Sequence, residues 1–361
     1  MEENLYWVWL SSLQGIGAVK KKRLIEDYKM PYNIFCKSET ELRQIAYLTD
    51  KNIDVLTDKK YIENAKKHLE DIYKNDIKII PINDENYFEL LKDIYDPPIV
   101  LYAKGKVKKN EISIGVVGSR KATSYGLNVA YDISDKLASF NITITSGLAR
   151  GVDTYAHKGA LKNKNRTIAV LGCGLDIVYP YENKALFEEI IQDGMVITEY
   201  LPKTKPAPYH FPARNRIISG ISRGILVVEA GAKSGSLITA DFALEQGRDV
   251  FAIPGNIGYK NSEGTNALIK DGARIVTSEN DILEEILGVV SNKKDLQKVK
   301  KYDNLNKVEE KIIECLSYQA MHIDLIAKNT KLDIKEINSA LIVLELKGII
   351  KQNDGKIFQI A

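Results

Sequence analysis

The chain has 361 residues, of which 44% are hydrophobic and 27% charged, a composition typical of folded globular protein. Its 51 Lys and Arg residues against 48 Asp and Glu residues leave a net charge of +3, so a nucleic-acid ligand would need a local basic site. No apolar run approaches the roughly 20 residues that span a bilayer, and three widely separated cysteines suit a reducing cytoplasm without disulfides or structural zinc.

Residues 1–75 are expected to form a small helical domain of the helix-hairpin-helix or SAM-like kind. Its stretch LSSLQGIGAVKKKRLIEDY places Gly15 and Gly17 around one apolar residue, followed by the basic run Lys20–Arg23. Such a tight turn can present backbone amides to a phosphate. A helix-turn-helix corner with a solvated basic face explains these residues at least as well.

From about Ile77 to Leu287, apolar β-branched runs alternate with stretches of helical periodicity. The runs are IVLYA, ISIGVV, ITITSG, TIAVLG, MVITEY, GILVVEA and DVFAIPG. This alternation predicts an α/β domain over residues 76–290, with a doubly wound parallel sheet covered on both faces. Ligands of such sheets bind beyond the C-terminal ends of the strands.

A polar, flexible linker is expected at residues 291–304. Residues 305–361 then predict three helices and a hairpin turning at Asn353–Gly355, the pattern of a winged helix-turn-helix. This unit has 8 Lys and Arg and 8 Asp and Glu, so its net charge is zero. Because reading duplex DNA requires neutralisation of phosphates, a protein-interaction or weak-binding role is favoured for it.

Four clusters of small residues directly follow predicted strands. They are Gly118-Ser119-Arg120, the stretch that begins with Ser146-Gly147, GCGLDIVYP and EAGAKSGSLITA. Since the ends of parallel strands meet at one edge, these turns are expected to surround one pocket whose amides, hydroxyls and helix N-termini suit anionic oxygens. Tight strand–helix packing would explain any single turn, but the recurrence favours a phosphate-binding edge.

Cations and an aromatic residue lie among these turns. Arg120 can hold a phosphate with two hydrogen bonds, and Lys233 precedes the helix start Ser234-Gly235-Ser236. The segment PYHFPARNRIISG adds Phe211 and the run Arg214, Asn215 and Arg216, an arrangement typical of single-strand binding by stacking and backbone charge. Phe211 could instead anchor a loop, and Arg216 could form an internal ion pair.

Asp153 and His157 stand four residues apart and would share one face of a helix. An enzyme could use such a pair as acid and base. A helix-start Asp that caps amides, with the His in a polar contact, is the more ordinary explanation. The sequence contains no Ser-His-Asp order, metal-ligand cluster or Walker lysine motif, so no catalytic triad or metal site is predicted.

Several motifs in order resemble the DNA-processing protein A (DprA/Smf) family. They are GVVGSRKATSYG, TSGLARGVDTYAHKGAL, TIAVLGCGLDIVYP, FPARNRIISGISRGILVVEAGAKSGSLITADFALEQGRDVFAIPG and EGTNALIKDGA, between about Ile77 and Ala273. The resemblance implies an extended Rossmann-like domain that binds single-stranded DNA, protects incoming strands and loads RecA recombinase on them during natural transformation. It also implies a homodimer without catalytic turnover or nucleotide cofactor. The implied DNA-binding motifs fall on Ser119-Arg120, Ser146-Gly147, Arg214–Arg216 and Lys233–Ser236.

Two other functions stay open. The fold also resembles phosphoribohydrolases of the lysine-decarboxylase-like group, whose nucleotide loop carries a catalytic Glu in a P-G-G-x-G-T-x-x-E pattern. Here Thr239 stands in that place, which leaves no obvious group to activate water. The third function is an interaction scaffold with residual DNA binding.

Overall fold

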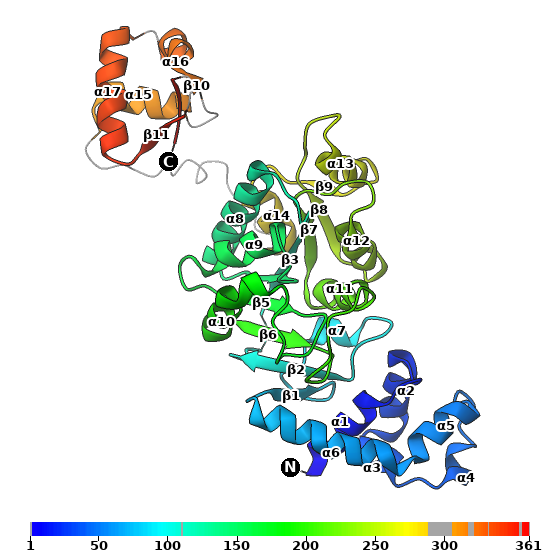
Figure 1. The fold of residues 1–361 in the computed structure, drawn as a ribbon. Coiled ribbons are helices and arrows are strands. Elements are labelled where there is room, and N and C mark those ends of the chain that lie inside the picture. Colours follow the sequence, from blue (N-terminus) through cyan, green and yellow to red (C-terminus); the bar gives the residue numbers. More distant parts are fainter. Residues whose placement is uncertain are drawn as a thin grey trace. The chain divides into compact units, whose positions relative to one another are not determined.

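Figure 1 shows the computed structural model, which describes residues 2–109, 111–287, 305–316, 321–330, 332–353 and 356–360. The contacts divide the chain into two compact units, Met1–Val290 and Ser291–Ala361. The linker expected at 291–304 lies outside the described residues, as do residues 354 and 355 of the expected hairpin turn. Among the described helices, none is long and apolar enough to cross a membrane.

The first unit begins with short helices. They are α1 (Glu2–Ser12), α2 (Ala18–Tyr28), α3 (Pro31–Phe35), α4 (Glu39–Leu42), α5 (Asp50–Thr57) and α6 (Lys59–Lys74). Capping boxes begin two of them, with Ser38 before α4 and Thr49 before α5. Trp7 and Trp9 of α1 are fully buried in a hydrophobic cluster that also contains Tyr102 of the sheet. The N-terminal helices therefore share a core with the sheet.

The sheet of the first unit has nine strands in the order β1-β2-β6-β5-β4-β3-β7-β8-β9. Their bounds are β1 Lys78–Pro81, β2 Val100–Gly105, β3 Ser113–Val117, β4 Thr143–Ser146, β5 Thr167–Val170, β6 Met195–Thr198, β7 Gly224–Val227, β8 Asp249–Ala252 and β9 Arg274–Ile275. The expected parallel sheet is confirmed from β6 to β9, but β2 runs antiparallel to both of its neighbours. An apolar run such as IVLYA reveals burial and not direction, so the sequence could not show this.

Helices cover both faces of the sheet (Figure 1). One face carries α8 (Ser124–Ser139), α9 (Val152–Leu161), α10 (Lys184–Asp193) and α14 (Glu279–Leu287). The other carries α7 (Glu89–Lys92), α11 (His210–Ile221), α12 (Gly235–Glu245) and α13 (Glu263–Lys270). The strand order reverses at β3, which has β4 on one side and β7 on the other. Doubly wound folds bind ligands at such a reversal.

The second unit has its own core. Its helices are α15 (Lys307–Leu316), α16 (Ile323–Thr330) and α17 (Ile334–Leu346), and its antiparallel sheet has the order β10 (Met321–His322), β12 (Ile357–Ile360) and β11 (Ile350–Asn353). Ile312, Leu341 and Phe358 meet in the hydrophobic centre. Three helices with a hairpin confirm the predicted winged helix.

Candidate nucleic-acid interface

A cavity of about 790 Å³ lies at the C-terminal ends of β3 and β7. These two strands are neighbours where the strand order reverses, and the turns after β4 and β5 add to the wall. The predicted site residues that line this strand-end cavity are Gly118, Ser119, Arg120, Phe211, Arg214, Asn215, Lys233, Ser234, Gly235 and Ser236. Ser146, Gly147 and Arg216 lie outside this lining. Gly147 lines a small adjoining hollow of about 20 Å³.

Three cations of the lining are free to bind an anion. Arg120, Lys121 and Lys233 are exposed, and none of them forms an ion pair or a side-chain hydrogen bond with any residue that the structure describes. The guanidinium of Arg120 lies 5.4 Å from the ring centroid of Phe211, a cation–π contact. No carboxylate among the described residues forms an ion pair with Arg120. Lys121 was not predicted, although its position beside Arg120 was a signal.

The start of α12 offers donors to the same cavity. Ser234 caps the helix, and its hydroxyl accepts from the backbone N of Ser236 at 3.4 Å. The amides of Lys233 and Gly235 have no hydrogen-bond partner within the described ranges. A side chain at Gly235 would meet nothing within 4 Å, so this helix end is open to a ligand. Unpaired amides and the helix dipole together favour an anion.

The turn after β3 is held differently. The Ser119 amide donates to the Glu229 carbonyl at 2.7 Å, and the Lys121 amide donates to the Ser119 hydroxyl at 3.1 Å. A Cβ at Gly151, whose φ is +75°, would lie 2.3 Å from the Ser119 carbonyl oxygen. Because these two amides are already hydrogen-bonded, they are not available to an anion. The turn would therefore bind an anion through the side chains of Arg120 and Lys121.

Aromatic rings stand beside the cations. The rings of Phe211 and Tyr179 are 5.5 Å apart with an interplanar angle of 32°, and both line the cavity. Arg120 lies over the Phe211 ring, so these three side chains form one cluster. Tyr209, two residues before Phe211 in the sequence, is largely exposed. The arrangement combines flat apolar surface with positive charge, and the sequence had indicated only Phe211 for stacking.

Arg214 holds strand ends together. Its Nη1 donates to the carbonyl oxygens of Gly147, at 2.7 Å, and of Val170, which places the buried guanidinium between the ends of β4 and β5. A Cβ at Gly147 would lie 2.5 Å from this guanidinium, which explains the glycine. Burial lowers the pKa of Arg214, and the neighbouring carboxylate of Asp153 opposes that change. Its Nη2 has no hydrogen bond among the described residues and remains available at the cavity wall.

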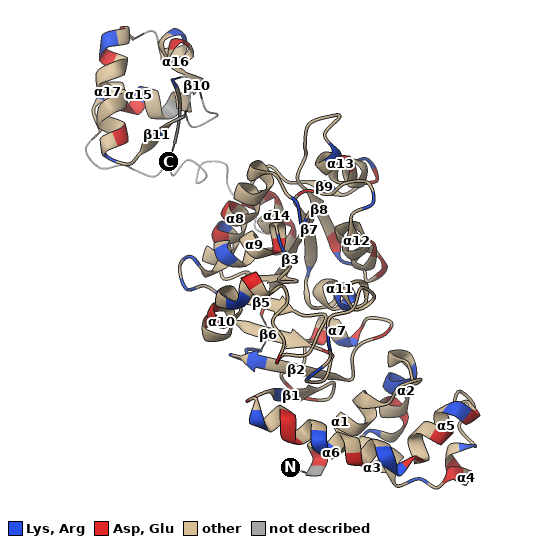
Figure 2. Cartoon of the chain, viewed as in Figure 1, with Lys and Arg blue, Asp and Glu red and all other residues tan. Residues whose placement is uncertain are grey.

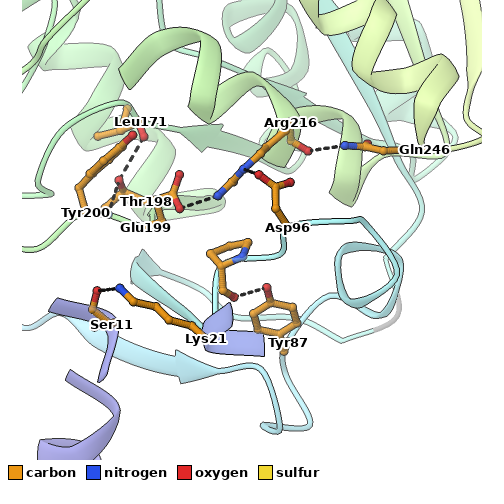
Figure 3. Close-up of polar contacts among 11 residues, drawn as sticks. Ser11, Lys21, Tyr87, Asp96, Leu171, Thr198, Glu199, Tyr200, Arg216 and Gln246 are labelled. Carbon is orange, nitrogen blue, oxygen red and sulfur yellow. Dashed lines mark hydrogen bonds and ion pairs between the residues drawn. The ribbon is translucent and has the colours of Figure 1, made fainter. Parts of the chain in front are cut away.

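Arg216, two residues along α11, lies in an internal ion pair. Figure 3 shows its guanidinium between two carboxylates, with Nε 3.0 Å from Asp96 Oδ2 and Nη2 2.7 Å from Glu199 Oε2. The side chain is only 7% exposed. This is the structural alternative that the sequence left open for Arg216. Its positive charge is neutralised inside the protein.

Three polar residues of β4 and the following helix α9 are also bonded internally. The Ser146 hydroxyl donates to the Val116 carbonyl at 2.7 Å and is fully buried. Asp153 accepts from the Gly147 and Ala149 amides at 3.1 and 3.3 Å. His157 contacts the Thr167 hydroxyl, and burial lowers the pKa of its ring to about 3. A neutral, buried His157 and an amide-capping Asp153 match the ordinary explanation of this pair.

Glu229 organises the site and was missed. This buried carboxylate lies two residues after the end of β7. It accepts hydrogen bonds from the backbone N of Thr123 at 2.9 Å and from the Thr123 hydroxyl at 2.5 Å. A Cβ at Gly126 would lie 2.5 Å from the Glu229 carboxyl carbon. The carboxylate thus fixes the start of α8 beside the β3 turn. Its place at a strand end was the only signal in the sequence.

The N-terminal glycine turn does not present its cations to a ligand. Lys20 donates to Asn52 Oδ1 at 2.7 Å, and Lys21 donates to the Ser11 carbonyl at 2.7 Å, as Figure 3 shows for the second. Lys22 donates to the Lys92 carbonyl at 3.2 Å, while Arg23 lies over the ring of Tyr47. These contacts favour a structural role for the basic run over phosphate binding. They connect α2 to its neighbours.

The winged unit presents little net charge. Figure 2 shows residues of both signs on α17, the helix that would read a DNA groove. Ile342 and Leu346 of that helix are 60% and 84% exposed. An apolar and nearly neutral helix surface is unsuited to binding phosphates. In the first unit, by contrast, unpaired cations gather at the strand-end cavity.

The chain is similar to several known proteins over most of its length. A model of the family described as DNA recombination-mediator protein A matches residues 78–287, and a model of the DprA winged helix domain matches residues 298–356. Protein Smf of Synechocystis sp. is 32% identical over 99% of this chain and 98% of its own length. The X-ray structure of DNA processing protein A from Streptococcus pneumoniae is similar with a TM-score of 0.68 and 37% identity, covering 79% of this chain and 98% of that one. The DNA processing protein A from Helicobacter pylori, whose single-stranded DNA binding mode is unique, has a TM-score of 0.54 and 29% identity, covering 59% of this chain and 96% of its own.

Proposed function

The chain belongs to the DNA recombination-mediator protein A family, and from this premise we propose that it binds single-stranded DNA at the strand-end cavity. The observation that carries the proposal is that three unpaired cations and the neighbouring rings of Phe211 and Tyr179 line one cavity at the switch point of the sheet. The single-strand binding of the similar protein from Helicobacter pylori supports it.

Each part of the cavity has a role in this proposal. Arg120, Lys121 and Lys233 bind backbone phosphates, and the Gly235 amide adds a donor at the start of α12. The rings of Phe211 and Tyr179 provide a face on which a base stacks, whatever its identity. Arg214 supports the site by joining the ends of β4 and β5. Arg216 contributes through the fold and not through DNA.

We also propose the finer functions that the family resemblance implies. The protein acts in the cytoplasm as a homodimer, protects incoming single strands during natural transformation and loads RecA recombinase on them. It performs no catalytic turnover in this role. Asp153, the one carboxylate among the described residues that line the cavity, already accepts two backbone hydrogen bonds. Thr239 lines the cavity at the position where the phosphoribohydrolases carry Glu.

The test compares DNA forms by fluorescence anisotropy. Oligo-dT should bind more tightly than blunt duplex of the same length, because only a single strand exposes bases to the rings of Phe211 and Tyr179. With three cations on phosphates, the logarithm of affinity should fall with the logarithm of salt at a slope of about −2, from about −0.7 per contact. Equal affinity for both forms would refute the proposal. Hydrolysis of nucleoside monophosphates, tested in parallel, would support the phosphoribohydrolase alternative.

A further inference from the structure

A second cavity, of about 430 Å³, lies at the C-terminal ends of β7 and β8. Its wall includes Tyr125 at the start of α8, Tyr259 in the loop after β8, and Asn261. Its volume lies within the range of roughly 300–1,000 Å³ that small-ligand pockets have. None of its lining residues was among the individually predicted DNA-binding residues.

Asn261 makes the two cavities neighbours. It lines both of them, and its Nδ2 donates to the Lys121 carbonyl at 3.0 Å and to Glu229 Oε2 at 3.1 Å. The amide side chain is thus fixed between the cation-bearing turn after β3 and the buried carboxylate. The cation-bearing turn and the second cavity are therefore close neighbours.

The two cavities differ in charge. Arg120, Lys121 and Lys233 line the first, whereas no Lys or Arg is among the described residues that line the second. The second cavity has the Glu229 carboxylate in its wall. A phosphate is therefore favoured in the first cavity and repelled from the second. An uncharged group suits the second.

The tyrosines supply surface of the right kind. Tyr125 is 57% exposed and Tyr259 is 62% exposed. Neither ring stacks on another ring, and neither hydroxyl has a hydrogen bond, in the part of the chain that the structure describes. Free aromatic faces that line a cavity next to a phosphate site are how proteins hold the bases of a single strand.

We infer that the cavity lined by Tyr125 and Tyr259 takes one nucleobase of the strand whose phosphates lie at Arg120, Lys121 and Lys233. The inference rests on the proposed function. It adds a base subsite in the second cavity, in addition to the Phe211 and Tyr179 rings in the first. The strand therefore crosses the cation cluster and does not end at it.

The test uses the full-length protein and short labelled oligo-dT strands in which one nucleotide at a time lacks its base. Tyr125→Ala and Tyr259→Ala should each weaken binding of the intact strand about tenfold, because they remove a stacking face. The variants should also become insensitive to base removal at one position where the wild type is sensitive. Tyr125→Phe and Tyr259→Phe, which keep the ring, should bind as the wild type does. Tyr95→Ala, which removes a ring that is 82% exposed and lines neither cavity, is the matched control.

Each outcome decides the inference. If the alanine variants bind strands as the wild type does while Arg120→Ala binds weakly, the base subsite is refuted and the proposed function stands. If the wild type binds no single strands, both fall. The alanine variants could instead lose affinity for a free deoxynucleoside but keep their affinity for the strand. The cavity is then a nucleoside site, and its assignment to the strand is wrong. If an alanine variant melts at a lower temperature than the wild type, its binding data are not used. The phenylalanine variants and the wild-type strands that lack one base then test the inference.

Discussion

Replacing Arg120 with alanine should weaken single-strand binding without harming the fold. The side chain is exposed, forms no ion pair or hydrogen bond with any described residue and lies over the Phe211 ring. Its charge also favours the ionised form of the buried Asp153 carboxylate. Exposed substitutions that break no such interaction usually change the free energy of unfolding by less than about 0.5 kcal/mol. For a domain of this size that corresponds to a shift in melting temperature of about 2 °C or less.

The loss of affinity should be much larger than the loss of stability. A hydrogen bond to a charged group contributes about 1.5–3 kcal/mol, and the openness of the site to solvent favours the lower value. Affinity for oligo-dT should therefore fall about tenfold at moderate salt. Because one phosphate contact is lost, the slope of log affinity against log salt should become shallower by about 0.7.

Anisotropy titrations at several salt concentrations, together with thermal melting, measure both effects. Arg223→Ala is the matched control, because it removes another exposed Arg side chain that forms no ion pair or hydrogen bond with the described residues. Arg223 precedes β7, at the opposite end of that strand from the cavity. Unchanged binding by a well-folded Arg120→Ala protein would show that the DNA lies elsewhere. A large drop in melting temperature would show that Arg120 has a structural role instead.

Three further predictions follow from the buried polar groups and the second unit. Arg216→Ala leaves Asp96 and Glu199 without their counter-charge, so it should lower the free energy of unfolding by about 3 kcal/mol. Urea titrations measure this change, and an unchanged unfolding midpoint would contradict the ion-pair role. Burial lowers the pKa of Lys21 to about 8, with Glu199 opposing the change, while an unfolded lysine titrates near 10.4. Between about pH 8 and 10 the unfolded chain therefore binds more protons at Lys21 than the folded chain does. The wild type should gain stability relative to Lys21→Met as the pH rises through this range, and parallel profiles of stability against pH would contradict this. Deletion of residues 305–361 should leave single-strand affinity within a few-fold, and a hundredfold loss would make the winged unit a principal binder.

The strand-end cavity was predictable because its parts are local in sequence. Each small-residue turn directly follows an apolar run, and the parallel arrangement brings their ends to one edge. What remained hidden depends on contacts between distant residues. Arg214 and Arg216 look alike in sequence, yet one joins two strand ends and the other pairs with Asp96, which lies 120 residues earlier. The antiparallel direction of β2 was hidden for a similar reason, since it depends on pairing with β1 and β6.

The fold sorts the cations of this chain by whether it offers them a partner. Burying an Arg or Lys without an acceptor is unfavourable, so side chains that point inward, such as Arg216 and Lys21, acquire carboxylates or carbonyl oxygens. Arg120 and Lys233 lie on turns at the sheet edge, where no described residue supplies such an acceptor. Their charge is therefore available to a ligand, even though the whole chain has a net charge of only +3. In the proposed function, DNA binding depends on a few unpaired cations at one place, and not on the basic runs that are most conspicuous in the sequence.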